Sequence, residues 1–230
     1  MAVSTVPSDY DRDPGRWRSR DERWLIGGDT HEVVAARIGR EGRVTVLDVG
    51  CGQGRLRELL PGRVSWFGLD ASPTQFQASP HRPLVLGDAT HLPFPDETFD
   101  AVAALWMLYH LADPRAAIRE AARVLRRDGL FAACTSARTN DPELCDGYPP
   151  TTFDAEEAPA VVESVFGGRN VEVERWDARL VELADRDAVA HYARSHFLPP
   201  EIADRVATPL MLTKRGVLVW ARKPGGRGPS

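Results

Sequence analysis

The chain has 230 residues, of which 43% are hydrophobic and 27% are charged, and this composition is typical of one globular domain. The formal net charge of −4 argues against general nucleic-acid binding, because the phosphate backbone attracts basic proteins. No apolar run approaches the roughly 18 residues of a membrane span, and residues 1–23 lack the apolar core of a secretory signal. We therefore expect a cytoplasmic protein without a membrane or nucleic-acid partner.

The first 29 residues are polar and rich in Asp, Arg, Pro and Ser, apart from aromatic residues such as Tyr10 and Trp17. They indicate an N-terminal arm that either closes over a site as a lid or frays as a tail. A helix then runs from Asp29 or Thr30 to Arg40, because Asp and Thr are favoured at helix N-termini.

Between residues 44 and 134, short apolar runs alternate with helical patterns. This alternation predicts parallel strands joined by right-handed helical crossovers, which make a doubly wound α/β sheet with helices on both faces. The predicted strands are 44–49, 64–69, 83–87, 99–105 and 129–134, and the predicted helices are 53–60 and 113–126.

After Thr135 the pattern loosens, and turn signals mark an exposed loop over 140–150. Residues at about 184–212 are predicted to form a helical cap inserted between the sixth and seventh strands, and 224–230 a disordered tail. The predicted elements of this half are a helix at 154–166, an extended segment at 171–183, a helix at 186–197, a short helix after Pro199-Pro200 and a strand at 216–222.

The most informative stretch is 46–56, where an apolar strand leads into Gly50, Gly52 and Gly54 and then into a helix. Glycines here allow a tight turn and a close approach of a ligand to the backbone, and the helix N-terminus favours a polar or anionic ligand group. The spacing does not match the dinucleotide fingerprint G-x-G-x-x-G, because Arg55 and Arg57 stand where the third glycine is required. The Gly-Lys-Ser/Thr of a phosphate-binding P-loop is also missing from this stretch.

Two acidic residues follow the next two strands. Asp70 ends the second strand, 22 residues after Asp48, and Asp88 follows the third strand. A carboxylate at the first position can accept hydrogen bonds from both hydroxyls of a ribose, and one at the second could accept from an adenine amino group. The ordered set of strand-end features therefore predicts a nucleoside-containing ligand.

Over residues 44–136 these motifs resemble the class I S-adenosylmethionine (SAM)-dependent methyltransferase family, in particular its small-molecule and ubiquinone-type branch. The resemblance implies a Rossmann-like, doubly wound, seven-stranded and mostly parallel sheet whose last strand, here Gly216–Arg222, is antiparallel. Its segments are Leu47-Asp48-Val49-Gly50-Cys51-Gly52-Gln53-Gly54, Leu69-Asp70-Ala71-Ser72-Pro73, Gly87-Asp88-Ala89-Thr90-His91-Leu92-Pro93-Phe94-Pro95-Asp96, Phe99-Asp100-Ala101-Val102, Leu108-Tyr109-His110-Leu111 and Leu125-Arg126-Arg127-Asp128-Gly129-Leu130.

The same resemblance implies a cofactor site for SAM, with S-adenosylhomocysteine (SAH) as the product. The glycine loop would hold the methionine part, Asp48 would orient that loop or the SAM ammonium, and Asp70 would hold the ribose. The implied cofactor-binding residues are Asp48, Gly50, Cys51, Gly52, Gly54, Asp70, Ala71, Phe76, Asp88, Ala89, Leu105 and Trp106.

Methyl transfer does not require one fixed catalytic residue, because SAM carries its own leaving group and in-line positioning lowers the barrier by up to about 7–11 kcal/mol. A general base is needed only where the acceptor must lose a proton. Histidine titrates near neutrality, so His110, beside the fourth strand, and His191 and His196, in the cap, are candidate bases. Each of them has an alternative role in packing.

Aromatic side chains could line an apolar pocket for the methyl acceptor. No metal site is predicted, because His191 and His196 are five residues apart and the three cysteines are widely spaced. The candidate acceptor or lid residues are Tyr10, Trp17, Trp106, Tyr109, His110 and Tyr192.

We interpret the chain as a SAM-dependent methyltransferase that acts on an O, N or C atom of a small aromatic or secondary metabolite, as a monomer or homodimer. Two alternatives stay open. One is a SAM-binding regulator or scaffold without methyl transfer, because no unmistakable base is present. The other is an NAD-dependent oxidoreductase, against which the unmatched G-x-G-x-x-G stands.

Overall fold

The structure is a computed structural model, and it describes residues 28–225. Only the innermost two residues of the predicted arm (1–29) and of the predicted tail (224–230) fall within this range, so the candidate lid residues Tyr10 and Trp17 lie outside it. Among the described residues, no helix combines the length and the apolar character that crossing a bilayer requires.

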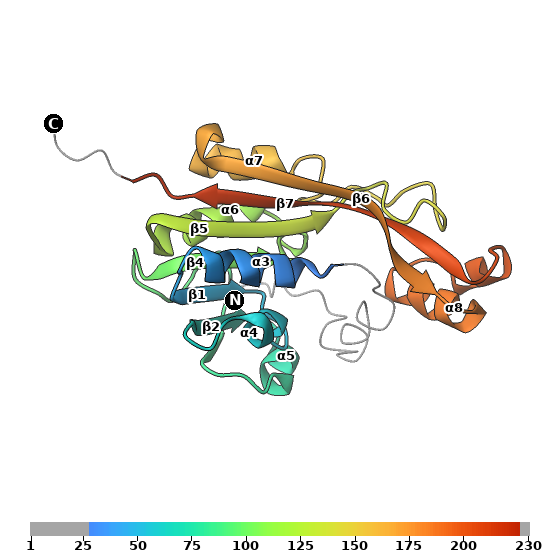
Figure 1. Cartoon of the computed structure of the whole chain (residues 1–230), viewed down its shortest axis with the longest axis horizontal. Coiled ribbons are helices and arrows are strands. Elements are labelled where there is room, and N and C mark those ends of the chain that lie inside the picture. Colours follow the sequence, from blue (N-terminus) through green and yellow to red (C-terminus); the bar gives the residue numbers. More distant parts are fainter. Residues whose placement is uncertain (1–27, 226–230) are drawn as a thin grey trace.

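Seven strands of the described chain form one sheet in the order β3-β2-β1-β4-β5-β7-β6 (Figure 1). Neighbouring strands are parallel, except that β7 runs antiparallel to both β5 and β6. The predicted seven-stranded, mostly parallel sheet is therefore confirmed. The strands are β1 (Thr45–Val49), β2 (Ser65–Asp70), β3 (Leu84–Leu86), β4 (Phe99–Leu105), β5 (Leu125–Ser136), β6 (Val171–Leu183) and β7 (Leu210–Arg222).

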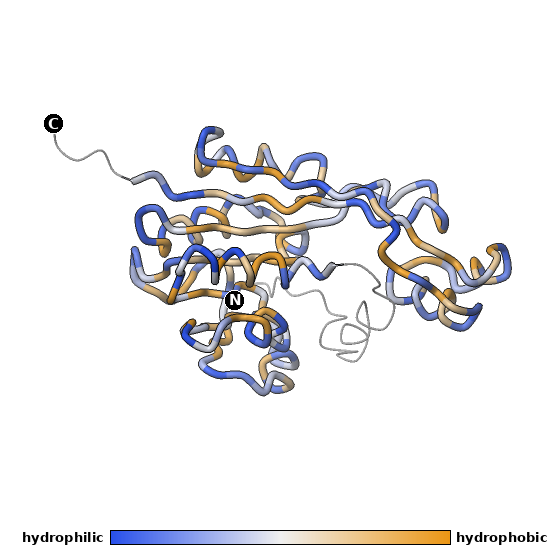
Figure 2. Tube along the Cα trace, viewed as in Figure 1, coloured by the Kyte–Doolittle hydropathy of each residue, from blue (hydrophilic) through white to orange (hydrophobic). Residues whose placement is uncertain are grey.

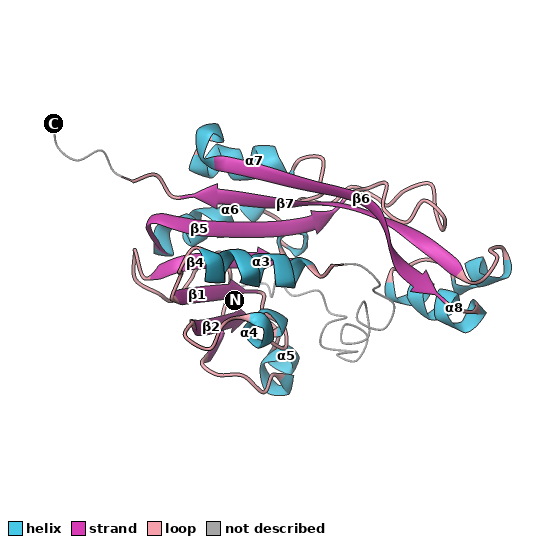
Figure 3. Cartoon of the chain, viewed as in Figure 1, coloured by secondary structure: helices cyan, strands magenta, loops and turns pink. Residues whose placement is uncertain are grey.

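Helices cover both faces of the sheet, as Figure 3 shows, which explains why the parallel strands are apolar almost throughout. On one face, Val34, Ile38 and Leu56 of α3 and α4 join a buried apolar cluster with the strands. On the other face, a second cluster includes side chains of α6 and α7, such as Ile118 and Val162. The helical elements are α3 (Thr30–Arg40), α4 (Arg55–Leu59), α5 (Pro73–Ala78), η1 (Leu108–His110), α6 (Pro114–Val124), α7 (Ala158–Phe166), η2 (Gly168–Asn170), α8 (Arg186–Ser195) and η3 (Pro200–Asp204).

Several boundaries differ from the sequence prediction. Helix α5 was not predicted, although Ser72 caps it through the N–H of Gln75 and Pro73 occupies its first turn; six residues are too few for an apolar periodicity. Helices α4, α6, α7 and α8 are shorter than predicted. Strand β7 begins at Leu210, six residues before the predicted start at Gly216.

The last two strands extend well beyond the sheet. β6 and β7 pair from Val171 opposite Ala221 to Leu183 opposite Leu210, whereas β5 pairs with β7 only as far as Ser136 opposite Gly216. Residues 177–183 and 210–215 therefore form a two-stranded ribbon past the carboxyl ends of the parallel strands (Figure 1). The predicted cap at 184–212 is thus a continuation of these strands, with helices only at 186–204.

The ribbon and the α8–η3 segment carry a small apolar core of their own, which we call the cap core. Figure 2 shows hydrophobic stretches recurring at this far end of the molecule, around α8. The cap core is separate from the two clusters on the faces of the sheet, so the cap has its own packing. Its buried residues are Leu144, Val181, Leu183, Val189, Tyr192, Ala203 and Leu212.

Candidate functional site

The loop after β1 is shaped by three glycines with positive φ: Gly50 at 67°, Gly52 at 53° and Gly54 at 91°. The N–H of Gly50 donates to the carbonyl of Leu69 at 2.7 Å, which ties the loop to the end of β2. A Cβ atom on Gly50 would lie 2.7 Å from the Cβ of Met107. The first glycine is therefore required by both its backbone conformation and its surroundings.

Asp70, at the end of β2, holds the same loop. Its Oδ2 accepts from the N–H of Gly52 at 2.8 Å, and its Oδ1 accepts from the N–H of Ser72 at 2.9 Å. A carboxylate offers about four acceptor positions. Holding the loop and accepting from the hydroxyls of a ligand are therefore compatible for this side chain.

Asp88 and Ala89 follow β3 and Gly87. The Oδ1 of Asp88 accepts from the N–H of Thr90 at 2.8 Å, and Ala89 is buried. This short turn brings the third strand-end feature to the same edge of the sheet as the glycine loop and Asp70.

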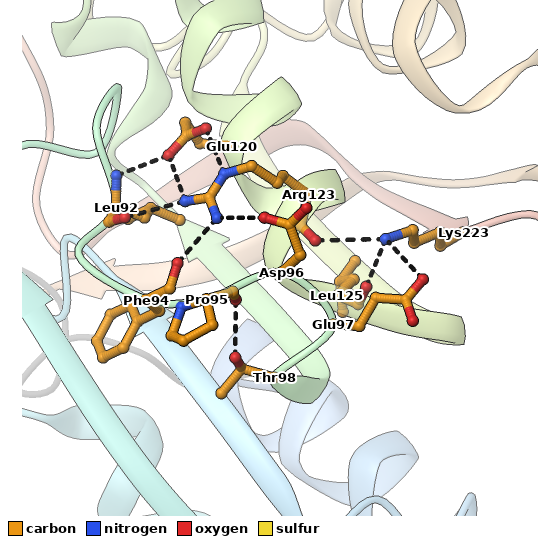
Figure 4. Close-up of polar contacts among 10 residues, drawn as sticks. All are labelled: Leu92, Phe94, Pro95, Asp96, Glu97, Thr98, Glu120, Arg123, Leu125 and Lys223. Atoms are coloured by element: carbon orange, nitrogen blue, oxygen red, sulfur yellow. Dashed lines mark hydrogen bonds and ion pairs between the residues drawn. The ribbon is translucent and has the colours of Figure 1, made fainter.

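The segment after this turn is held against α6 by Arg123 (Figure 4). Its guanidinium donates to the carbonyls of Leu92 at 3.0 Å and Phe94 at 2.8 Å, and it pairs with Asp96 at 2.8 Å. Glu120 completes the network, because it pairs with Arg123 and accepts from the N–H of Leu92 at 2.8 Å. The network anchors the chain directly after the Asp88–Ala89 turn.

A cavity of about 100 Å³, the small cavity, lies where these strand ends meet. Its walls come from the glycine loop, the ends of β2 and β3, helix α5 and the segment after β4. Its lining residues are Gly50, Gly52, Leu69, Asp70, Ala71, Ser72, Gln75, Gly87, Asp88, Ala89, Trp106, Met107, His110 and Leu111.

Gln75 of α5 supplies a polar group to the small cavity. Its side chain is buried, with 4% exposed, and its Nε2 has no hydrogen-bond partner among residues 28–225. A buried unpaired donor costs about 1–3 kcal/mol, so this amide indicates a ligand that accepts a hydrogen bond. The glycine loop and Asp70 line the same cavity, so a ligand with both hydrogen-bond acceptors and donors would suit it.

A second cavity of about 980 Å³, the large cavity, extends from the start of α3 and the glycine loop to the ribbon and the cap. Four residues line both cavities, so the two are contiguous: Gly50, Gly52, Gln75 and Trp106. The aromatic side chains that line the large cavity are Trp106, Tyr109, Tyr148, Trp176 and Phe197.

Two of these aromatic residues have an unusual backbone. Trp106 has a φ of 58° and Phe197 a φ of 60°, and positive φ is rare for bulky side chains. The ring of Trp106 packs edge-on against Trp176 with 6.0 Å between centroids, whereas Phe197 is 68% exposed. Strained residues of this kind concentrate at ligand sites.

Most of the predicted cofactor residues line one of the cavities. Three do not. Asp48 is buried behind the loop, the position of Gly54 faces His81, and the ring of Phe76 lies 5.5 Å from the guanidinium carbon of Arg82. On α5, Gln75 lines the cavity in place of Phe76. The lining set is Gly50, Gly52, Asp70, Ala71, Asp88, Ala89 and Trp106 in the small cavity, with Cys51 and Leu105 in the large one.

Burial shifts the pKa values of the Asp48 and Cys51 side chains. The Oδ2 of Asp48 accepts from the indole N–H of Trp66 at 3.1 Å. Burial raises the pKa of Asp48 to about 7, although the hydrogen bond from Trp66 opposes this shift. This contact joins β1 to Trp66 of β2, and both implied roles of Asp48 stay predictions. Burial also raises the pKa of the Cys51 thiol, which disfavours a nucleophilic thiolate.

The acceptor-side predictions have mixed outcomes. His110, in η1, lines the small cavity and Tyr109 lines the large one. His191 lines neither, whereas His196 lines the large cavity and stacks on Tyr192 with 3.9 Å between centroids. The prediction that Tyr192 lines a substrate pocket is wrong, because its side chain is fully buried in the cap core.

Tyr192 belongs to a buried polar cluster around Asp141, which is 0% exposed. The Oδ1 of Asp141 pairs with the Nζ of Lys214 at 2.8 Å. Its Oδ2 accepts from the hydroxyls of Tyr192 at 3.0 Å and Tyr148 at 2.9 Å, and from Asn140 Nδ2 at 2.9 Å. The cluster joins the loop after β5 to the cap and to β7.

Asp154, Glu156 and Glu157 place their carboxylates within 4.8 Å of one another, a spacing that would suit a metal ion. Arg138 lies among them, with its Nε 3.1 Å from Asp154 Oδ2 and a further ion pair to Glu157. The guanidinium supplies the positive charge at this place, so we interpret the cluster as an ion-pair network.

Several cavity residues were missed in the sequence. Ser72-Pro73 was a sufficient signal for α5 and hence for Gln75. Asp29 was interpreted only as a helix cap and no site role was predicted for His31, yet both line the large cavity. No local pattern places the start of α3 beside the glycine loop, so their position required the tertiary structure.

Comparisons with known proteins give a consistent result. Residues 47–133 match the family model described as a methyltransferase domain. The chain is 29% identical over 135 residues to the uncharacterized methyltransferase YcgJ of Bacillus subtilis strain 168, covering 54% of this chain and 53% of that protein. It is 38% identical over 116 residues to the demethylmenaquinone methyltransferase of Corynebacterium kroppenstedtii, covering 48% and 51%. The chain thus spans about half the length of these curated relatives.

Among solved structures, the crystal structure of the cyclase SpnF aligns with a TM-score of 0.65, over 98% of both chains and at 20% identity. At this identity the likeness concerns the fold alone. The likeness extends beyond the matched domain, since it includes the β6–β7 region and the cap.

Proposed function

We propose that the chain, whose residues 47–133 match a methyltransferase domain, is a class I SAM-dependent methyltransferase that binds SAM at the small cavity and methylates an O, N or C atom of a small molecule held in the large cavity. The glycine loop would hold the methionine part of the cofactor. Asp70 would accept from the ribose, and Asp88 and Ala89 would contact the adenine edge.

The observation that carries this proposal is the buried amide of Gln75, which has no partner among the described residues and lines both cavities. A donor in this place requires an acceptor, and the carboxylate of Asp70, which lines the same small cavity, has capacity to accept further hydrogen bonds. Adenosine provides ring nitrogens and hydroxyls together, so one ligand could bond to both side chains.

Bound SAM would supply an electrophilic methyl group together with its own leaving group. The protein would contribute position, since in-line alignment is worth up to about 7–11 kcal/mol. Trp106 lines both cavities, so its ring would flank the acceptor at their junction. Its strained backbone and its contact with Trp176 would keep that ring in place.

The large cavity favours an acceptor with an extended, partly aromatic body. Small-molecule sites measure roughly 300–1,000 Å³, and the large cavity, at about 980 Å³, is at the upper end. Aromatic walls bury flat rings well, and one relative is named for demethylmenaquinone, a quinone. We further propose, as the sequence predicts, that the protein is cytoplasmic and acts in secondary metabolism. We also propose that it is a monomer or a homodimer.

Calorimetric titration of SAH tests the cofactor site. The wild type is expected to bind SAH, and Asp70→Ala to weaken binding tenfold or more, about 1.4 kcal/mol, because the variant loses a ribose acceptor and an anchor of the loop. Asp146→Ala is the control, since it removes an exposed carboxylate that lines neither cavity; its affinity should equal that of the wild type.

The outcomes separate the alternatives. A wild type without SAH binding contradicts the proposal, and a titration with NAD then tests the oxidoreductase. SAH binding without turnover of SAM across a panel of phenols, amines and carbon nucleophiles favours the non-catalytic regulator or scaffold.

A further inference from the structure

The large cavity contains a histidine–aspartate pair to which no role has yet been given. Asp29 caps the N-terminus of α3, and His31 is the second residue of that helix. The Oδ1 of Asp29 lies 2.9 Å from the Nδ1 of His31 and also accepts from its backbone N–H at 2.8 Å. The two side chains are 15% and 22% exposed, and both residues line the large cavity together with Gly50 and Gly52.

This contact determines which imidazole nitrogen carries the proton. Burial opposes the charge on Asp29, but hydrogen bonds from His31 and Arg55 outweigh it and lower the pKa of Asp29 to about 2. Asp29 is therefore a carboxylate at neutral pH and can only accept. The Nδ1 of His31 must carry the hydrogen, and in the neutral imidazole the lone pair is then on Nε2.

Asp29 is itself held in place. Its Oδ2 accepts from the Nε of Arg55 at 3.1 Å, and Arg55 also pairs with Glu58 of α4. Among residues 28–225, the charged and titratable groups near His31 are Asp29 at the start of α3, Arg55 and Glu58 on α4, and the buried Asp48 of β1, which His31 influences electrostatically. An imidazole oriented by a carboxylate that is fixed by a third group is the arrangement of a general base.

The position of His31 distinguishes it from the other histidines of the described chain. His110 lines the small cavity, where the adenosine would lie. His196 lines the large cavity from the cap, with its Nδ1 at 2.9 Å from the carbonyl of Tyr192. His31 lines the large cavity from the start of α3, where Asp29 contacts Arg55, the residue directly after the glycine loop.

We propose that His31 is the general base of the methyl transfer and that Asp29 is its positioning residue. The proposal rests on the proposed function and applies to O–H and N–H acceptors. As the acceptor atom forms its bond to the methyl carbon, the electron pair of the carbon–sulfur bond stays on sulfur and the acceptor proton moves to Nε2 of His31. The imidazolium then loses this proton to water.

The test uses para-nitrophenol, an O–H compound whose ionisation is visible by absorbance, added to the full-length protein saturated with SAH at a pH below the pKa of the free phenol. The wild type is expected to produce the phenolate band, His31→Gln to lose it and Asp29→Asn to weaken it. His191→Gln is the matched control, because His191 lines neither cavity, and it should keep the band. A wild type without the band, or a His31→Gln variant that keeps it, overturns the proposal.

Two further measurements separate this proposal from its premise. Nitrogen NMR of the imidazole, assigned with His31→Gln, is expected to show the Nδ1–H tautomer in the wild type and its loss in Asp29→Asn; an Nε2–H tautomer in the wild type contradicts the pair. SAH calorimetry on the same samples tests the proposed function. If every variant binds SAH but the phenolate band is absent, the result contradicts the role of the His31–Asp29 pair and not the cofactor site.

Discussion

The molecule has two sides that are held together by hydrogen bonds over different distances along the chain. The first, which we call the cofactor side because the proposed cofactor would lie there, comprises residues 45–111. The second, the cap side, comprises the ribbon, residues 186–204 and the loop 137–157. Asp70 bonds partners 2 and 18 residues away. Asp141 bonds Tyr192 and Lys214, which are 51 and 73 residues away. Asp70 thus joins the glycine loop to the end of the next strand, whereas Asp141 joins the loop after β5 to the cap and to β7.

The two sides also differ in the amount of buried apolar packing. The cofactor side lies on a sheet with a large buried cluster on each face. The cap core has only a few buried side chains, and a small core supplies little stability by itself. The comparison suggests that the cap depends on its polar cluster, whereas the cofactor side depends on the sheet.

The largest expected effect follows from Asp141→Asn. Removal of one partner from a buried ion pair costs about 3–5 kcal/mol, because the ammonium of Lys214 keeps its desolvation penalty without its counter-charge. Urea unfolding should show this loss, and hydrogen exchange should locate it in α8 and the ribbon. SAH affinity of the folded variant should stay unchanged.

The control for this change is Asp146→Asn, which removes an exposed carboxylate of the same loop and should stay within about 0.5 kcal/mol of the wild type. An Asp141→Asn protein as stable as the wild type, or one whose SAH affinity fell with its stability, would break the comparison between the two sides.

A smaller effect is expected on the cofactor side from Asp48→Asn. The pKa of Asp48 rises from 3.8 to about 7 on folding, so the folded state binds the proton more tightly than the unfolded state. Its contribution to the free energy of unfolding therefore falls as the pH rises through this window, by up to about 1.4 kcal/mol per pH unit. The Asp48→Asn variant should lack this pH dependence of the free energy of unfolding. Urea unfolding of both proteins at several pH values between the two pKa values measures it. Equal slopes for both proteins would contradict it.

The smallest expected effect follows from Gln75→Met, which replaces the unpaired amide by an apolar chain of similar length. The ligand-free protein should become more stable by about 1 kcal/mol, since the unsatisfied donor is removed, while SAH affinity should fall a few-fold. Thermal unfolding and calorimetry give the two quantities. Gln77→Met, on the exposed face of the same helix, should change neither, and a loss of affinity there would assign the effect to α5 as a whole.

The parts that the sequence predicts well are those in which neighbours along the chain form the contact. The glycine loop, the Asp70 turn and the Asp88–Ala89 turn each follow a strand, and parallel strands bring their carboxyl ends to one edge. Phe76 was misplaced because α5 was not recognised, and on a helix a shift of one residue turns a side chain by about 100°. Gln75 therefore faces the cavity and Phe76 faces Arg82.

By itself, the sequence determined the α/β order, the sheet edge where the small cavity lies and most of the residues that line it, because strand periodicity and turn chemistry are local. Only the tertiary structure decided that Tyr192 is core rather than pocket, that β6 and β7 extend into a ribbon, and that the start of α3, with its local Asp29–His31 pair, lies against Arg55 at the end of the glycine loop. These outcomes depend on burial and on contacts between distant segments, and no local pattern encodes which distant groups a side chain will meet.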